Sequence, residues 1–200
     1  MINLPNPQTE DTLTARQIRE LARKAVDGDV PGTKVIRHFL ANTTDSAAIA
    51  STASATNFNK SVTLSKSLYE VGRVFNIKAN GVYSSTGTPT LIFAILLGST
   101  TLVTFAAKTA INNASNQSWA IDGDLVVRSL GATGTLMCSG VLRVNTSAGV
   151  DTVETKVNAA ATTANLNTAQ ALQINLTWSA SDAANTATLK SLIVSLSDYA

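Results

Sequence analysis

The fold is decided by the stretch Thr90-Leu-Ile-Phe-Ala-Ile-Leu-Leu97, which lies between Pro89 and the pair Gly98-Ser99. This stretch has the length of a β-strand and is far too short to cross a membrane as a helix. Because it is apolar at consecutive positions, both of its faces need cover, either inside the protein or in a subunit interface. Gly98-Ser99 then predicts a tight turn into a second strand over residues 101–107.

Segments on both sides of this stretch alternate apolar and polar residues, which is typical of half-buried strands. The apolar members are Phe75, Ile77 and Ala79 in one segment, and Leu172, Ile174, Leu176 and Trp178 in another. Further strands are expected at residues 121–130, 135–144, 150–157, 170–179 and 188–197. Eight or nine strands without intervening helices predict an all-β fold, an antiparallel jelly-roll-like β-sandwich. An immunoglobulin-like sandwich is the alternative. The low-complexity stretches 48–55 and 159–169 are expected to be loops or loosely held edge segments.

The first 33 residues differ from the rest and predict a short helical arm, so that residues 1–33 form an N-terminal arm and residues 34–200 the β-sandwich domain. Thr14 and Gln17 make a capping box, and Gly28 and Pro31 end the helix, which is expected over residues 15–26. The arm must bury its apolar stripe against its own sheet or against a partner. Its basic face either grips an acidic surface or is simply solvated. The interaction residues expected in the arm are Leu13, Ile18 and Leu21 as apolar anchors and Arg16, Arg19, Arg23 and Lys24 as the basic face.

Composition argues against nucleic-acid and membrane partners and against secretion. Charged residues make up 14% of the chain and the formal net charge is +2, which is too weak for the counterion-release affinity of a nucleic-acid groove. No apolar run reaches membrane-spanning length, and the N-terminus lacks the pattern of a signal peptide, so we expect a protein made in a cytoplasm that does not bind membranes. The single cysteine, Cys138, excludes an intrachain disulfide.

Residues that could support catalysis are few, and each has a simpler interpretation. His38, the only histidine, lacks a Gly-x-Ser-x-Gly elbow or a nearby carboxylate, so it is expected to be an ordinary strand residue. Cys138 alternates with apolar neighbours and is expected in the core. Asp122 and Asp124 could form a glycosidase pair or half of a calcium site, but their alternation favours a solvated strand face. We therefore expect no enzyme, no cofactor and no catalytic or metal-binding residue.

Two blocks of sequence resemble segments of tailed-bacteriophage virion proteins. One is Ile77-Lys-Ala-Asn-Gly-Val-Tyr-Ser-Ser-Thr-Gly-Thr-Pro-Thr-Leu91 with its sequel Leu96-Leu-Gly-Ser-Thr-Thr-Leu-Val103; the other is Trp119-Ala-Ile-Asp-Gly-Asp-Leu-Val-Val-Arg-Ser-Leu-Gly-Ala-Thr-Gly-Thr135, together with the closing Leu176-Thr-Trp-Ser-Ala-Ser181. The resemblance covers residues 58–197 and omits the arm. It implies a virion component of the capsid decoration (cement) or fibre type, in which trimers of β-sandwiches clamp onto a capsid or tail.

Three functions follow from these observations. The leading one is a non-enzymatic virion structural protein, a homotrimer that decorates the capsid and bridges neighbouring subunits of the major capsid protein or another virion protein. Its self-association residues are expected to be Ile92 and Leu96. The alternative is a phage fibre or receptor-binding head that recognises host surface glycans, with Trp119 as the residue to test. The third, a glycosidase-type enzyme, depends on Asp122 and Asp124 alone.

Overall fold

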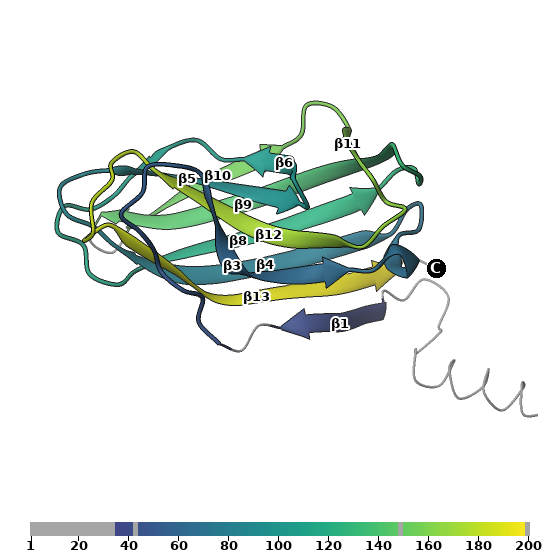
Figure 1. Ribbon diagram of the computed structural model, residues 1–200, viewed down its shortest axis with the longest axis horizontal. Coiled ribbons are helices and arrows are strands. Elements are labelled where there is room, and N and C mark those ends of the chain that lie inside the picture. The colour runs from purple at the N-terminus through teal and green to yellow at the C-terminus, as the bar shows by residue number, and fades with distance from the viewer. Residues whose placement is uncertain (1–34, 42–43, 148–149, 199–200) are drawn as a thin grey trace, which may run out of the picture.

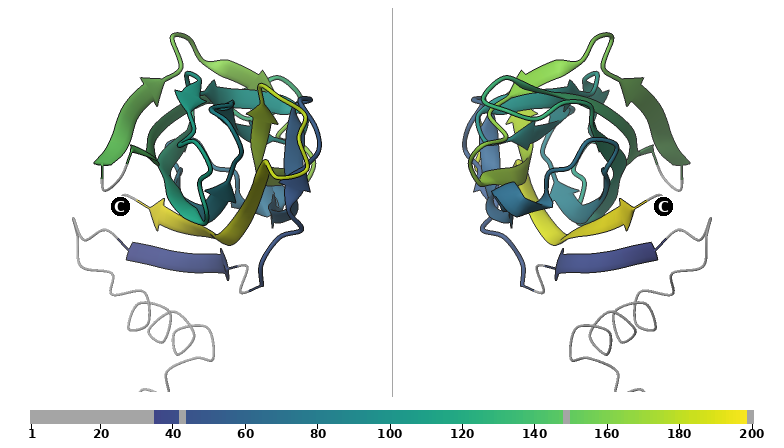
Figure 2. Two further views of the ribbon diagram at one scale, coloured as in Figure 1. Left: turned by 90° about the vertical axis from the view of Figure 1, so that its left-hand side faces the viewer. Right: turned by 90° about the vertical axis from the view of Figure 1, so that its right-hand side faces the viewer.

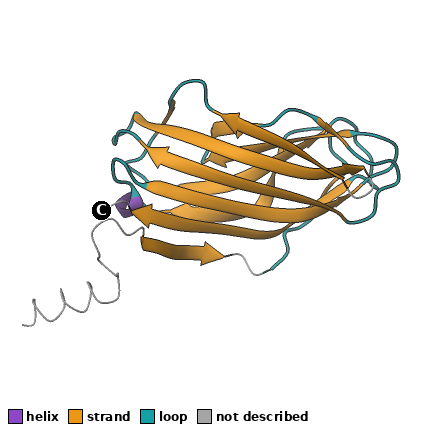
Figure 3. Cartoon of the chain, turned by 180° about the vertical axis from the view of Figure 1, so that it is seen from behind, coloured by secondary structure: helices purple, strands orange, loops and turns teal. Residues whose placement is uncertain are grey.

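The computed structural model describes residues 35–41, 44–147 and 150–198, and nearly all of their regular secondary structure is antiparallel β-sheet (Figure 3). Thirteen strands and one short 3-10 turn, Lys66–Leu68, occur within these residues. The all-β prediction is therefore confirmed. The helix expected over residues 15–26 lies outside the described residues.

The strands form two sheets that face each other, as the end views in Figure 2 show. Sheet A contains, in spatial order, β1 (Val35–Ala41), β13 (Thr186–Asp198), β4 (Val74–Ser84), β8 (Gln117–Val127), β9 (Gly134–Ser147) and β10 (Val150–Val157), with β2 (Ile49–Ala50) on β13 and β11 (Thr162–Ala164) on β9. Sheet B contains β3 (Thr56–Leu64), β12 (Gln170–Trp178), β5 (Thr90–Leu97) and β6 (Thr100–Thr104), with β7 (Lys108–Thr109) on β5.

The strand order is that of a jelly roll with one added hairpin. Four antiparallel pairs nest inside one another along the chain: β1 with β13, β3 with β12, β4 with β8, and β5 with β6. These pairs distribute as β1-β13-β4-β8 in sheet A and β3-β12-β5-β6 in sheet B, which is the jelly-roll arrangement. The immunoglobulin-like alternative is therefore wrong. The hairpin β9–β10 is inserted between β8 and β12, and it widens sheet A beyond the edge of sheet B (Figure 1).

Aromatic contacts across the core join the two sheets. Trp119 of sheet A lies 5.5 Å from Phe58 and 4.8 Å from Phe93, both of sheet B, measured between ring centroids. Tyr83 and Trp178 make a second cross-sheet contact at 6.3 Å, in an edge-on geometry. Such pairs add to the hydrophobic stabilisation of burying large rings. The alternating apolar residues of β4 and β12 supply much of the remaining core, as their spacing predicts.

Element boundaries agree with the sequence wherever the apolar pattern is strong. β5 and β10 begin and end where predicted, and Gly98, with φ of +60°, forms the tight turn from β5 into β6. β8 starts four residues earlier than expected, at Gln117, because its first four residues pair with the C-terminal part of β4. The two low-complexity stretches contain the short strands β2 and β11, so they are held to the edges of sheet A.

Candidate interaction surfaces

The outer surface of sheet B is built from the residues of β3, β12, β5 and β6 that alternate with buried ones; we call it the sheet-B face. Along β5 it carries Ile92, Ala94 and Leu96, while the intervening residues of this strand are buried in the core. Ala94 is only 7% exposed, whereas Ile92 and Leu96 are partly exposed. These three residues and Thr177 line a shallow hollow of about 210 Å³. The structure thus places the two predicted self-association residues on one surface, on either side of Ala94 along β5.

The sheet-B face has no charged side chain at any outward position of its four long strands. Asn175 is the one polar residue there that is nearly buried, and its amide donates to Asn57 at 2.8 Å. The outward positions hold Asn57, Asn59, Ser61 and Thr63 of β3, Ala171, Gln173, Asn175 and Thr177 of β12, Thr90, Ile92, Ala94 and Leu96 of β5, and Thr101 and Thr104 of β6. Depletion of charge is the compositional mark of the buried centre of protein interfaces.

The outer surface of sheet A, the sheet-A face, is charged, and its ionic groups are largely paired. Asp122 accepts from Arg143 at 2.5 Å and lies 3.9 Å from the Lys78 ammonium. Asp124 accepts from the Asn76 amide at 2.5 Å. From β4 to β10 and in β13, the charged side chains that the structure describes on this face are Lys78, Asp122, Asp124, Arg143, Asp151 and Lys190. The prediction that the two aspartates belong to a solvated strand face is confirmed.

An open trough of about 640 Å³ runs along the middle of the sheet-A face. Its floor is the backbone of Gly123 and Gly140, which lie opposite each other in the β8–β9 register. A Cβ on Gly140 would lie 2.8 Å from Phe105 Cζ, and one on Gly123 would lie 3.3 Å from Ile95 Cδ1, so only glycine lets the sheets approach this closely. The trough is lined by the apolar residues Ile77 and Val141 and by the polar residues Asn76, Lys78, Asp122, Asp124, Ser139, Thr155 and Ser195.

Of the groups considered for catalysis, Cys138 lies in the core, whereas Asp122 and Asp124 lie on the sheet-A face. Cys138 is 1% exposed, and burial, with a further contribution from the charge of Asp124, raises the pKa of its thiol to about 12. It is a core residue, as predicted, and not a nucleophile. His38 lies in β1 opposite Ser195 of β13. Within residues 35–41, 44–147 and 150–198, no three His, Cys, Asp or Glu side chains gather where they could hold a metal ion.

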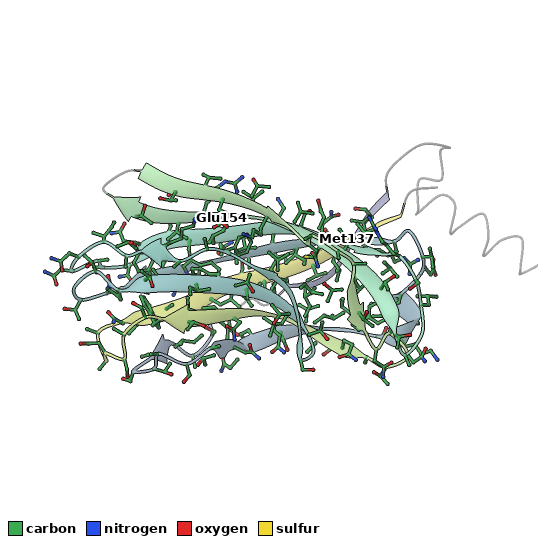
Figure 4. All side chains as sticks on the ribbon, turned by 90° about the horizontal axis from the view of Figure 1, so that it is seen from above. Met137 and Glu154 are labelled. Carbon is green, nitrogen blue, oxygen red and sulfur yellow. The ribbon has the colours of Figure 1, made fainter. Side chains whose placement is uncertain are left out.

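An ion pair between β10 and the segment that follows β6 was not predicted from the sequence. Glu154, labelled in Figure 4, accepts from Lys108 Nζ at 2.7 Å and from the Ala106 amide at 3.0 Å, and both charged side chains are at most 15% exposed. Burial opposes ionisation of this carboxyl, but the hydrogen bonds and charges of Lys108, Ala106 and Lys156 outweigh it and hold the pKa of Glu154 below its ordinary value. The pair ties the added hairpin to sheet B.

Every aromatic side chain from Phe58 to Trp178 is buried in the core. Trp119 and Trp178 are each 1% exposed, and the indole nitrogen of Trp119 donates to the Val82 carbonyl at 3.3 Å. Trp119 therefore packs in the core and cannot stack on a ligand. The other described aromatic side chains are buried as well, namely Phe58, Tyr69, Phe75, Tyr83, Phe93 and Phe105.

The expected arm residues cannot be located on either face, because they lie outside the described residues. They are Leu13, Arg16, Ile18, Arg19, Leu21, Arg23 and Lys24. The first described strand, β1, pairs with β13 at the edge of sheet A, so the chain enters the sandwich there. Among the described residues, no helical segment has the length and apolar character required to cross a membrane.

Comparisons with known proteins give structural likeness but no relative in sequence. No protein-family model matches the chain, and no curated protein is significantly similar to it. The structure is similar to a solved structure described as the CBM2 module of the evolved Dit of Lactobacillus casei BL23 phage J-1, with a TM-score of 0.33 and 7% identity. The match covers 74% of this chain and 73% of that one. At this TM-score the likeness carries no conclusion about function, and the fold assignment rests on the strand order.

Proposed function

We propose that the protein is a non-enzymatic structural component of a bacteriophage virion that forms a homotrimer and decorates the capsid by binding the major capsid protein or another virion protein. The observation that carries this proposal is the sheet-B face, whose outward strand positions are uncharged and whose centre carries the partly exposed side chains of Ile92 and Leu96. The sequence resemblance to tailed-phage virion proteins supports the assignment to a virion.

The energetics of association favour this face over the opposite one. Burying Ile92 and Leu96 removes apolar area from water at about 25 cal/mol per Å², and no charge on the outward strand positions has to be desolvated. The surrounding Thr, Asn and Gln side chains provide hydrogen-bonding groups for the rim. In a trimer that binds a particle at three points, weak individual contacts add up through effective concentration.

The test is to place charge at the centre of the sheet-B face in the full-length chain. Ile92→Lys and Leu96→Lys should each convert the trimer to monomer in sedimentation equilibrium and reduce binding to particles that lack the protein. Leu130→Lys is a matched control, because Leu130 is a 51% exposed apolar residue outside this face. Unchanged trimers in both face variants would overturn the proposed contact.

The glycan-binding alternative has one specific observation in its favour, the trough of the sheet-A face. Its hydroxyl, amide and carboxylate groups are those that hydrogen-bond sugar hydroxyls, and Ser139, Thr155 and Ser195 belong to this set. No aromatic side chain is among the described residues that line the trough, which counts against this alternative. A glycan array probed with the full chain and with Asp124→Ala distinguishes glycan binding from the structural role. A signal that is lost in Asp124→Ala would assign glycan binding to the trough, whereas no signal with either protein would favour the structural role alone.

A further inference from the structure

β10 is the free edge of sheet A, and its exposed side chains are unusual for an edge strand. It pairs with β9 on one side and has no strand on the other (Figure 2). Edge strands normally discourage further pairing with charges, prolines or bulges. Here the outward row of β10 carries Val153, which is 57% exposed, and Val157, which is 56% exposed. These are two of the four large apolar side chains exposed in the described part of the chain.

The direction of the backbone groups along β10 follows from its pairing with β9. The register is regular from Asp151 to Val157, and the next residue, Asn158, donates its backbone N–H to the Cys138 carbonyl at 3.1 Å. Because backbone groups alternate sides in an antiparallel strand, even-numbered residues of β10 turn theirs to β9. The N–H and C=O groups of Val153, Thr155 and Val157 therefore point to the free edge.

The residue pattern around Thr155 is self-complementary. The five residues Val153-Glu-Thr-Lys-Val157 read as apolar, acidic, neutral, basic and apolar. If this segment meets a copy of itself in antiparallel orientation about Thr155, Val153 faces Val157 twice, and Glu154 faces Lys156 twice. The residues that would exchange backbone hydrogen bonds are Val153, Thr155 and Val157, whose N–H and C=O groups point to the free edge.

Other registers lose this match. An axis through Glu154 or through Lys156 sets like charges directly opposite each other, which destabilises a cross-strand pair. An axis through Val153 leaves Lys156 opposite Val150, without an acidic partner. With the axis through Thr155, apolar and opposite-charge pairs each contribute roughly 0.2–1 kcal/mol beyond the backbone hydrogen bonds.

We propose that β10 pairs with β10 of a second copy of this chain about a two-fold axis at Thr155, so that two copies of sheet A become one continuous sheet. The contact lies on a sheet edge and uses none of the sheet-B face, so it is independent of the proposed trimer. Where both contacts form, the edge contact links one trimer to another. The inward-facing pair of Glu154 with Lys108 is retained, and Lys156 of the second copy adds another cation beside it.

Disulfide trapping in the full chain tests the position of the axis. Thr155→Cys places two thiols opposite each other at the axis, at a Cα separation of about 5.5 Å that suits a disulfide. Val153→Cys is the matched control, because its two copies would lie about 13 Å apart along the paired strands. Cys138, buried and with its pKa raised to about 12, does not compete for oxidation. Cross-linked dimer in the Thr155 variant alone supports the proposal, and equal cross-linking of both variants, or of neither, overturns it.

Charge substitution tests the register without covalent capture. In Val153→Lys/Val157→Lys, lysine faces lysine in both outer pairs, whereas in Val153→Lys/Val157→Glu, lysine faces glutamate. We expect the like-charge variant to associate at least about tenfold more weakly than the complementary one in sedimentation velocity. Val71→Lys, at a 63% exposed valine away from β10, should behave as the unaltered chain. All of these variants are also made in a chain that carries Ile92→Lys, so that the proposed sheet-B contact does not contribute to association. If the two double variants associate equally in that chain, the proposed pairing of β10 is wrong.

Discussion

The two outer faces of the sandwich follow the same alternation of buried and outward residues but carry different kinds of side chain. The structure describes six charged residues on the sheet-A face, and Asp122 with Arg143 forms its central ion pair. The sheet-B face has none at the outward positions of its long strands, and Ile92 and Leu96 lie at its centre. Desolvating a charge costs several kcal/mol, so only the uncharged face can enter an interface without that penalty. The two outer faces therefore differ in their suitability for an interface because of their charge, although both are built in the same way.

The largest effect on stability is expected where the two sheets approach each other most closely. Gly140→Val would drive a side chain into Phe105 and Ile95 and should lower the free energy of unfolding by about 3 kcal/mol. The added side chain would also push sheet A away from sheet B at the floor of the trough. Urea denaturation measures the loss, and Ser139→Ala, the outward neighbour, should stay within about 0.5 kcal/mol of the parent. An unchanged midpoint for the valine variant would show that the sheets can move apart freely.

The next largest effect contrasts a buried ion pair with those on the sheet-A face. Glu154→Gln should cost about 1–3 kcal/mol at neutral pH, because it leaves Lys108 enclosed without a counter-charge. Since folding lowers the pKa of Glu154, its contribution is fully present above the ordinary value of 4.5 and is lost as pH falls through the lower folded value. The difference in urea midpoint between parent and variant should therefore shrink between pH 6 and about pH 2. A constant difference across this range would contradict the assignment.

A smaller effect is expected on the sheet-A face itself. Arg143→Ala removes the cation beside Asp122, but both side chains are more than 40% exposed, so water replaces much of what is lost. We expect a decrease of at most about 1 kcal/mol, reduced further in about 1 M salt. Thermal denaturation at low and high salt measures it. A cost as large as that of the Glu154 variant would mean that this face is enclosed in the protein's working state.

The smallest effect on folding is expected on the sheet-B face. Thr104→Lys changes an exposed outward residue of β6, opposite Ala94, and should alter the free energy of unfolding by less than about 0.5 kcal/mol. Its effect on self-association should instead be about tenfold, since a lysine would have to be desolvated at the contact. Comparing unfolding curves with sedimentation equilibrium separates the two. Loss of stability with intact association would reverse the proposed roles.

Strands with strong apolar patterns could be predicted from the sequence, whereas contacts between distant segments could not. β5 was predicted to the residue because Pro89 and Gly98-Ser99 flank it, and Cys138 was placed in the core because it alternates with leucines. The start of β8 at Gln117 was missed, because its first residues are polar and their place is set by pairing with β4.

For the candidate surfaces, the sequence identified side chains but not their neighbours. Ile92 and Leu96 could be named because alternation places them on one side of β5. The Glu154–Lys108 pair could not, because its members are far apart in sequence and meet only when the added hairpin folds over the segment after β6. The same limit applies to Trp119: local sequence cannot tell an indole that faces a ligand from one that packs on Phe58 and Phe93.

The pairing of β1 with β13 has a mechanical consequence. Val35 lies opposite Asp198, so the first and last described residues are neighbours at one end of the sandwich (Figure 1). Tension applied between those two ends would open the β1–β13 ladder one hydrogen bond at a time, like a zipper. A pull on Val35 resisted at the opposite end of the sandwich would instead load all of the ladder's hydrogen bonds together, in shear. A tether through residues 1–34 therefore holds the sandwich best when the opposing force acts at its far end.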